Sequence, residues 1–215
     1  TIIFYGILGG GVLVAMGLLV NHSATLPPII PLAGLIGAGI GLFVLANLDT
    51  NTPAAGIYYA FGPMVAGIAV TMPSLTTLIM SAVPSGSAGV GSAMNDTTRE
   101  MGGALGVAVL GSLLTTRFTG ALSPALSALP PDAQATANTG LAGALDVARD
   151  LPGGAGPALA DAARSAFVDG MSLAAGLAAA VVIATAAISY RLLPAGHLRA
   201  ATAEEAAKEA AAEAA

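Results

Sequence analysis

The stretch "GSAGVGSAMNDTTREMGGALGVAVLGSLL", Gly86 to Leu114, places three charged residues directly before a run of glycines and apolar residues. Asp96, Arg99 and Glu100 carry the charges, and the uncharged run extends only from Met101 to Thr116. Such a run is shorter than the about 20 residues that span the hydrocarbon core of a membrane. We therefore expect the helix to begin earlier, near Ser92, and to include the charged turn.

The composition of the whole chain indicates a membrane protein. Of 215 residues, 55% are hydrophobic and 9% are charged, whereas a soluble domain is about 25% charged. Residues 1–95 carry one formal charge, Asp49. The seven lysines and arginines form no basic patch, which excludes nucleic acid as a partner. The net charge of −5 comes largely from glutamates near the C-terminus and describes a tail.

The apolar runs predict an all-α integral membrane bundle of about five transmembrane helices over residues 1–199. We expect spans at 1–20, 29–48, 57–83, 92–117 and 166–190. Residues 118–165, rich in Ala, Pro and Gly, form an extracytoplasmic loop with short surface helices such as "TGLAGALDVARD". Residues 200–215 form a cytoplasmic tail, an orientation that the distribution of Lys and Arg favours by a thin margin. The absence of an initiator methionine, in a chain that opens inside an apolar run, indicates a fragment or processed piece.

The charged turn supplies the candidate site residues. Asn95, Thr98 and Arg99 are predicted to point into an aqueous cavity, where they contact substrate or a gate. The alternative is an interfacial cap, in which Asp96 lies near the helix start and Arg99 reaches the lipid headgroups. A local Asp96–Arg99 pair is compatible with both interpretations.

Small residues and prolines supply the candidate packing and kink positions. Gly102 and Gly106 form a G-x-x-x-G step beside Gly103, which lets helix backbones approach closely in a membrane. Pro63 and Pro73 interrupt the third span and predict kinks. Asp169, near the start of the fifth span, is either a proton carrier or a helix cap or interfacial group.

No catalytic or metal-binding constellation is visible in the sequence. His22 has no second ligand nearby, which argues against a metal site, and the chain has no cysteine. No nucleotide-binding loop and no set of nucleophile and base appears. We therefore expect neither an enzyme nor a bound cofactor.

The order "GIAVTMPSLTTLIMSAVPSGSAGVGSAMNDTTREMGGALGVAVLGSLL", then a long Ala/Pro loop, then "AFVDGMSLAAGLAAAVVI", resembles the last three spans of major facilitator superfamily transporters of the fourteen-span drug:proton antiporter group. The resemblance covers about Ile29 to Pro194. It implies multidrug efflux of amphipathic or cationic small molecules, driven by the proton gradient and by alternating access between two halves. It places the chain in the bacterial plasma (inner) membrane as a multi-pass protein with a cytoplasmic tail.

The resemblance also implies what the chain lacks. The proton-coupling acids, the basic loop after the second span and the antiporter glycine-proline motif of these transporters lie in the other half. The expected partners are therefore the lipid bilayer, the N-terminal half of the transporter and a small-molecule substrate, and the chain alone is expected to be inactive. The alternative from a different class is a non-transporting membrane helical module or truncated product that acts only as a structural or partner subunit.

Overall fold

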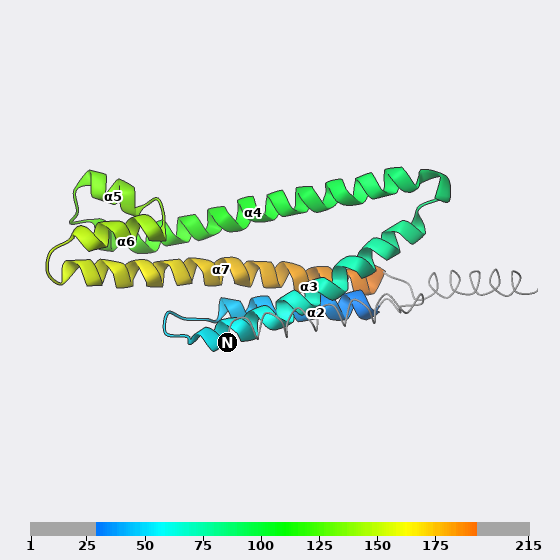
Figure 1. Cartoon of the computed structure of the whole chain (residues 1–215), viewed down its shortest axis with the longest axis horizontal. Helices are drawn as coiled ribbons and strands as arrows, with labels where there is room; N and C mark the ends of the chain where they lie inside the picture. The colour runs from blue at the N-terminus through cyan, green and yellow to red at the C-terminus, as the bar shows by residue number, and fades with distance from the viewer. Residues whose placement is uncertain (1–28, 193–215) are drawn as a thin grey trace, which may run out of the picture. The chain divides into compact units, whose positions relative to one another are not determined.

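In a computed structural model of the chain, residues 29–192 are described, and every regular element among them is a helix (Figure 1). The expectation of an all-α architecture is confirmed for this part of the chain. The predicted span at 1–20, His22 and the tail at 200–215 lie outside the described residues. The elements are α2 (Ile29–Ala46), α3 (Ala54–Ala82), the 3-10 helix η1 (Ser85–Ser87), α4 (Ala88–Leu126), α5 (Pro131–Ala137), α6 (Leu141–Asp150) and α7 (Ala155–Leu192).

Among the described helices, α3, α4 and α7 are long and apolar enough to cross a membrane, and α2 is a shorter apolar helix. Large apolar side chains are exposed along all four; Val107 on α4, for example, is 77% exposed. Contiguous exposed apolar surface on this scale is rare on soluble monomers and typical of surfaces that meet lipid or other helices. The described residues are therefore consistent with part of a helical membrane bundle, whereas the expected number of five spans stays a prediction.

The helices α4 and α7 are longer than the predicted spans they contain. α4 has 39 residues, about 58 Å at 1.5 Å per residue, which is well beyond the about 30 Å of a hydrocarbon core. It continues past residue 117, and α7 begins before residue 166. Both helices therefore extend into the region expected to lie outside the membrane, and the membrane boundaries themselves stay predictions.

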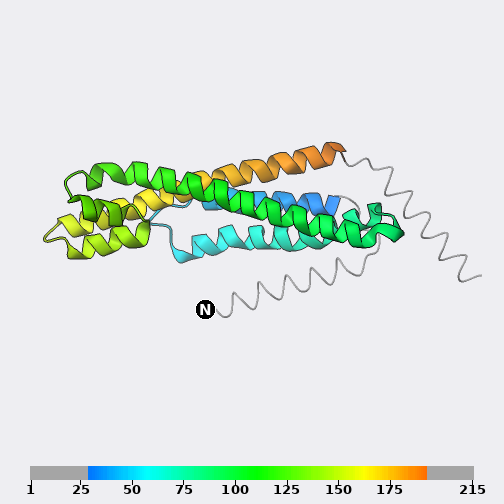
Figure 2. The ribbon, with the colours of Figure 1, turned by 90° about the horizontal axis from the view of Figure 1, so that it is seen from above.

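The described residues fall into two compact units. The first contains residues 29–41, 62–95 and 180–192. Within it, α2 and α3 lie side by side (Figure 2), because Gly34 and Gly67 leave no side chain between the two backbones. A Cβ on Gly34 would lie 2.7 Å from the Gly67 carbonyl oxygen, and a Cβ on Gly67 would contact the Gly34 carbonyl oxygen in turn. This is the close helix approach that small residues allow.

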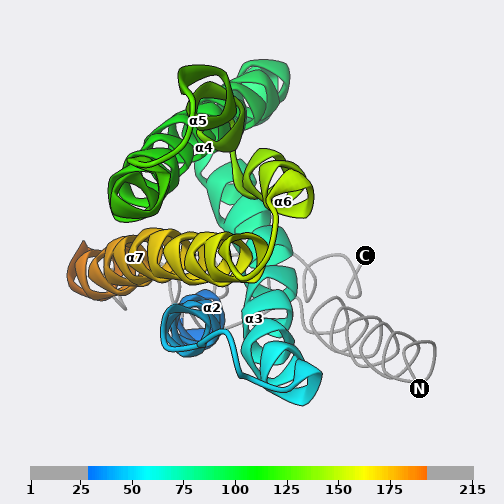
Figure 3. The same ribbon diagram turned by 90° about the vertical axis from the view of Figure 1, so that its left-hand side faces the viewer.

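The second unit contains residues 42–61 and 96–179 and holds a buried core at the far end of α4. There α5 and α6 pack beside α4 and the first turns of α7 (Figure 3). We call this region, residues 118–166, the cap. Its "TGLAGALDVARD" segment is helical as expected and forms α6. The core residues of the cap are Phe118, Leu122, Leu126, Ala137, Ala144, Ala148, Leu159, Ala163 and Ala166.

Candidate functional site

A tight turn joins α3 to α4 and positions the candidate site residues. Pro84 precedes η1 with extended backbone angles, φ −57° and ψ 141°, as expected for a residue that ends one helix and opens the next. Gly91, in the first turn of α4, is buried against Val83 at the end of the preceding helix, and a Cβ there would lie 2.7 Å from the Val83 Cγ2 atom. The glycine therefore allows α4 to fold back tightly after α3.

Asn95, Thr98 and Arg99 follow within the next three turns of α4. Asn95 is half-buried, whereas Thr98 and Arg99 are exposed. Asn95 and Arg99 are four residues apart and therefore share one face of the helix. The arrangement brings an amide and a guanidinium together, two groups that bind polar or anionic ligands, but whether they contact substrate stays a prediction.

The predicted Asp96–Arg99 pair is confirmed. The Arg99 Nη2 atom lies 3.7 Å from the Asp96 Oδ1 atom, and the two side chains are 61% and 58% exposed. This separation is longer than a hydrogen bond, and exposed pairs of this kind stabilise a protein by about 0–1 kcal/mol. Asp96 therefore holds Arg99 only loosely. The guanidinium keeps N–H donors for a substrate or gate in a cavity, or for a lipid headgroup at the interface.

The glycine row of α4 is open within its own unit, among the described residues 42–61 and 96–179. A Cβ built on Gly102, Gly103 or Gly106 would meet nothing within 4 Å. The predicted packing role of this row therefore stays a prediction. Gly34 and Gly67, which are in helix contact, were missed, although their four-residue spacing to Ala38 and Thr71 is a visible signal in the sequence.

Pro63 and Pro73 lie inside α3, which continues through both. Each proline lacks an N–H and therefore removes one helical hydrogen bond. Near Pro73, four hydroxyls donate to the carbonyl oxygens four residues earlier, at 2.8–3.0 Å; they belong to Thr71, Ser74, Thr76 and Thr77. Such bonds tend to bend helices, which supports Pro73 as a bending position, and the kinks themselves stay predictions.

The interpretation of Asp169 as a cap at a helix start is wrong, whereas its interpretations as an interfacial group or a proton carrier stay predictions. α7 begins at Ala155, about four turns earlier, so Asp169 is an exposed residue in the body of the helix. The uncharged span begins well after the start of the helix, because the first turns of α7 carry charged residues. The helix continues through Asp161 and Arg164 into the cap.

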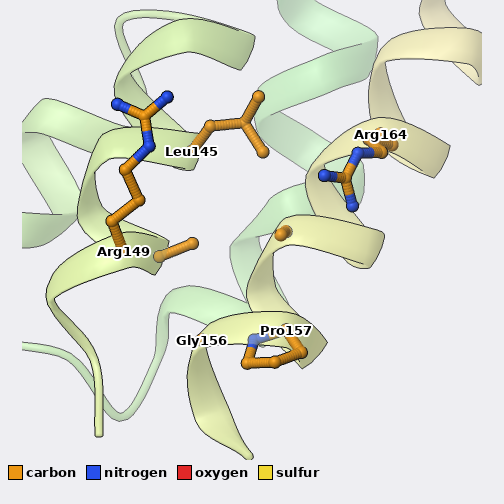
Figure 4. A pocket seen from close by; sticks show the side chains of 7 residues that line it. Leu145, Arg149, Gly156, Pro157 and Arg164 are labelled. Carbon is orange, nitrogen blue, oxygen red and sulfur yellow. The ribbon is translucent and has the colours of Figure 1, made fainter.

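A cleft in the cap was not expected from the sequence (Figure 4). Arg149 on α6 and Arg164 on α7 stand on opposite sides of it, and each donates from Nη1 to an aspartate of its own helix, Asp146 or Asp161, at 2.8 Å. The repeated D-x-x-R spacing, which Asp96 and Arg99 share, is the sequence signal for these pairs. The cleft has a volume of about 280 Å³ and is lined by Leu145, Ala148, Arg149, Gly156, Pro157, Ala160 and Arg164.

A second, apolar groove lies between α4 and α7, with a volume of about 440 Å³. Its lining is almost entirely aliphatic, with two hydroxyls as the polar groups: Ala108, Val109, Ser112, Leu113, Thr116 and Leu177. The groove is shallow and open, and its lining offers mainly apolar contact. Within the described residues, no three His, Asp or Glu side chains gather in a way that could hold a metal ion.

Comparison with known proteins places these features in context. No family model matches the chain. It is 31% identical to the multidrug efflux pump LfrA of Mycolicibacterium smegmatis over 163 residues, which are 75% of this chain and 32% of that protein. It is 29% identical to the tetracenomycin C resistance and export protein of Streptomyces glaucescens over 164 residues, 73% of this chain and 30% of that protein.

A third relative is the methyl viologen resistance protein SmvA of Salmonella typhimurium, 28% identical over 169 residues that cover 71% of this chain and 34% of that protein. The chain thus spans about a third of the length of these relatives. Their names describe efflux, export and resistance rather than catalysis, which confirms the prediction that the chain is not an enzyme.

Proposed function

We propose that this chain, which is homologous to part of the multidrug efflux pumps of the major facilitator superfamily, supplies the C-terminal helices of a fourteen-span drug:proton antiporter. The observation that carries the proposal is the 31% identity to LfrA over 163 residues, which are 75% of this chain. The long apolar helices α3, α4 and α7 support it as well. The role of the chain is to complete the transport path between the two halves of such a transporter.

The proposed substrates are amphipathic or cationic small molecules. The apolar groove between α4 and α7, with hydroxyls from Ser112 and Thr116, supports this class because it offers aliphatic contact with few fixed polar groups. A surface of this kind accepts ligands of varied shape, since apolar contacts are non-directional. Asn95, Thr98 and Arg99 are proposed to contact substrate or a gate at the inner mouth.

Proton coupling is proposed to depend on residues of the N-terminal half. Among the described residues of α2 and α3, Asp49 in the intervening turn is the one acidic side chain. It is tied into that turn by the Thr52 hydroxyl at 3.0 Å. A carboxylate held in a polar turn is a poor proton carrier across a membrane. Asp169, exposed in the body of α7, stays a candidate carrier. Because the family resemblance assigns the coupling acids to the N-terminal half, this chain alone is expected not to transport.

The proposed topology has five spans in a bacterial inner membrane. The turn around Pro84 and the tail at 200–215 face the cytoplasm, and the cap lies outside. The buried core of the cap and its exposed ion pairs support an aqueous location, since neither feature is needed in hydrocarbon. Because the chain has no cysteine, Ser127→Cys is expected to react with an impermeant maleimide from outside and Ala203→Cys only from inside. The reverse pattern contradicts the topology.

The proposed function is tested by co-expressing the chain with a matching N-terminal half in cells that lack their own efflux pumps. Proton-driven export of a fluorescent cationic dye is expected from the pair, from neither piece alone, and not after the proton gradient is dissipated. Membrane insertion and co-purification of the two pieces are measured in the same cells. Background export from pieces that insert and associate contradicts the transporter proposal and favours the structural subunit.

A further inference from the structure

Thr71 lies at the crossing of α2 and α3 and is 5% exposed. Its Oγ1 atom is 2.8 Å from the Gly67 carbonyl oxygen of its own helix and 3.3 Å from the Pro31 carbonyl oxygen of α2. A threonine hydroxyl has one proton. It therefore donates one well-aligned hydrogen bond at a time, although two acceptors from two different helices are within reach.

Two glycines leave room for this hydroxyl between the backbones of α2 and α3. A Cβ built on Gly34 would contact Thr71 Oγ1, and a Cβ built on Gly67 would lie 3.1 Å from the Ala38 Cα atom. The hydroxyl thus sits between two backbones with no side chain to separate them. The Gly67 acceptor belongs to the same helix as Thr71, whereas the distance to the Pro31 acceptor depends on how closely α2 approaches.

The part of α3 that carries Thr71 has weakened backbone hydrogen bonding. Pro73 has no N–H, so the Ala69 carbonyl oxygen loses its usual helical donor. The buried Ser74 hydroxyl donates to the Val70 carbonyl oxygen at 2.8 Å, as Thr71 does to that of Gly67. A proline together with hydroxyls bonded to the preceding turn is a recognised cause of helix bending.

We infer that Thr71 is a two-position latch between α2 and α3. In one position its proton is donated to the Gly67 carbonyl oxygen while α3 is bent near Pro73. In the other position the proton is donated to the Pro31 carbonyl oxygen, and the part of α3 after Pro73 has moved relative to α2. The inference deepens the proposed function and rests on it for its purpose, because alternating access needs packed helices with two discrete arrangements.

The latch is tested in the assembled transporter with pairs of spin labels on a cysteine-free background. One pair joins Ile36→Cys on α2 to Ile79→Cys beyond Pro73, and the reference pair joins Ile36→Cys to Val65→Cys before Pro73; all three side chains are exposed. The parent is expected to give two distance populations for the first pair and one for the reference pair. Thr71→Val is expected to reduce the first pair to one population, and Thr71→Ser, which keeps the hydroxyl, to retain both.

The outcomes separate the latch from the proposed function. A single population for the first pair in the parent, two populations in Thr71→Val, or loss of one in Thr71→Ser each overturns the latch. If Thr71→Val does not accumulate in the membrane, Thr71→Ser and Thr71→Ala carry the same test. Distances that respond as expected in a protein that exports no dye uphold the latch and contradict the transporter. Normal dye export together with distances that do not respond to the Thr71 variants overturns the latch and upholds the transporter.

Discussion

The part of α4 that lies in the cap and the part that precedes it differ in how far the other helices of the second unit cover their side chains. In the cap, Phe118, Leu122 and Leu126 are all at most 2% exposed and pack on α5, α6 and α7. In the preceding half, Gly102, Gly103 and Gly106 face open space, and the large apolar side chains around them are exposed. One continuous helix thus joins a segment that completes its own core to a segment that does not.

This difference shows that the apolar character of α4 serves two separate purposes. In the cap, leucines and phenylalanine bury surface against polar-faced short helices, as in a soluble protein, and the hydrophobic effect stabilises the arrangement. In the first half, apolar side chains point outward and small residues form a row, which suits lipid on some sides and another helix on one side. Predictions that compare the two halves therefore test the assignment directly.

The largest effect is expected from Leu122→Ala in the cap. Leu122 is 0% exposed, so the substitution removes buried methyl groups and leaves a cavity, lowering the free energy of unfolding by about 2–5 kcal/mol. Leu105→Ala is the matched control, because Leu105 lies on the same helix and is 62% exposed. Denaturant titration of the chain in detergent, followed by circular dichroism, measures both, and equal losses contradict the division of α4.

A smaller loss is expected from Gly156→Ala, where the first turn of α7 approaches α6. A Cβ on Gly156 would contact the Ala148 carbonyl oxygen, whereas a Cβ on Gly154, two residues earlier, meets nothing within 4 Å. Crowding a packed backbone costs about 1–3 kcal/mol. Gly156→Ala is therefore expected to lower the free energy of unfolding by that amount in the same titration and Gly154→Ala to leave it nearly unchanged. A neutral Gly156→Ala means that the cap is loosely packed.

The sequence predicted the helical class and the apolar segments because hydrophobicity over about 20 residues is a local property. It did not predict the cap, since Ala137, Ala144 and Ala148 become core residues only through tertiary packing with side chains of the other cap helices. It did not single out Gly34 and Gly67, whereas the packing role that it assigned to Gly102, Gly103 and Gly106 stays a prediction. A small-residue row permits close approach, but the neighbour that uses it is decided by tertiary packing, which set Gly34 against Gly67.

A gain of stability is expected from Gly106→Ala in the isolated chain. Glycine in the interior of a helix is less favourable than alanine by about 0.5–1 kcal/mol, and nothing within 4 Å opposes the added Cβ. Gly120→Ala is the matched control, since Gly120 lies on the same helix and is equally open. Both should gain alike in the isolated chain. After assembly with the N-terminal half, thermal denaturation should show a loss for Gly106→Ala alone if the row packs against another helix.

The smallest effect on stability, with a large effect on transport, is expected from Arg99→Ala. Because Arg99 is exposed and its pair with Asp96 is 3.7 Å long, its removal changes the free energy of unfolding by no more than about 0.5 kcal/mol. If the guanidinium contacts substrate or a gate, dye export by the assembled transporter falls about tenfold or more, the equivalent of one charge-assisted hydrogen bond.

Arg99→Lys separates the two interpretations of this residue. A headgroup anchor needs a positive charge at the interface, so lysine restores both abundance and export. A cavity contact that uses the planar fork of the guanidinium is not replaced by an ammonium group, and export stays low while abundance in the membrane is normal. Loss of abundance in Arg99→Ala, rescued by lysine, assigns Arg99 to the interface and leaves Asn95 and Thr98 as the remaining candidates on that part of α4.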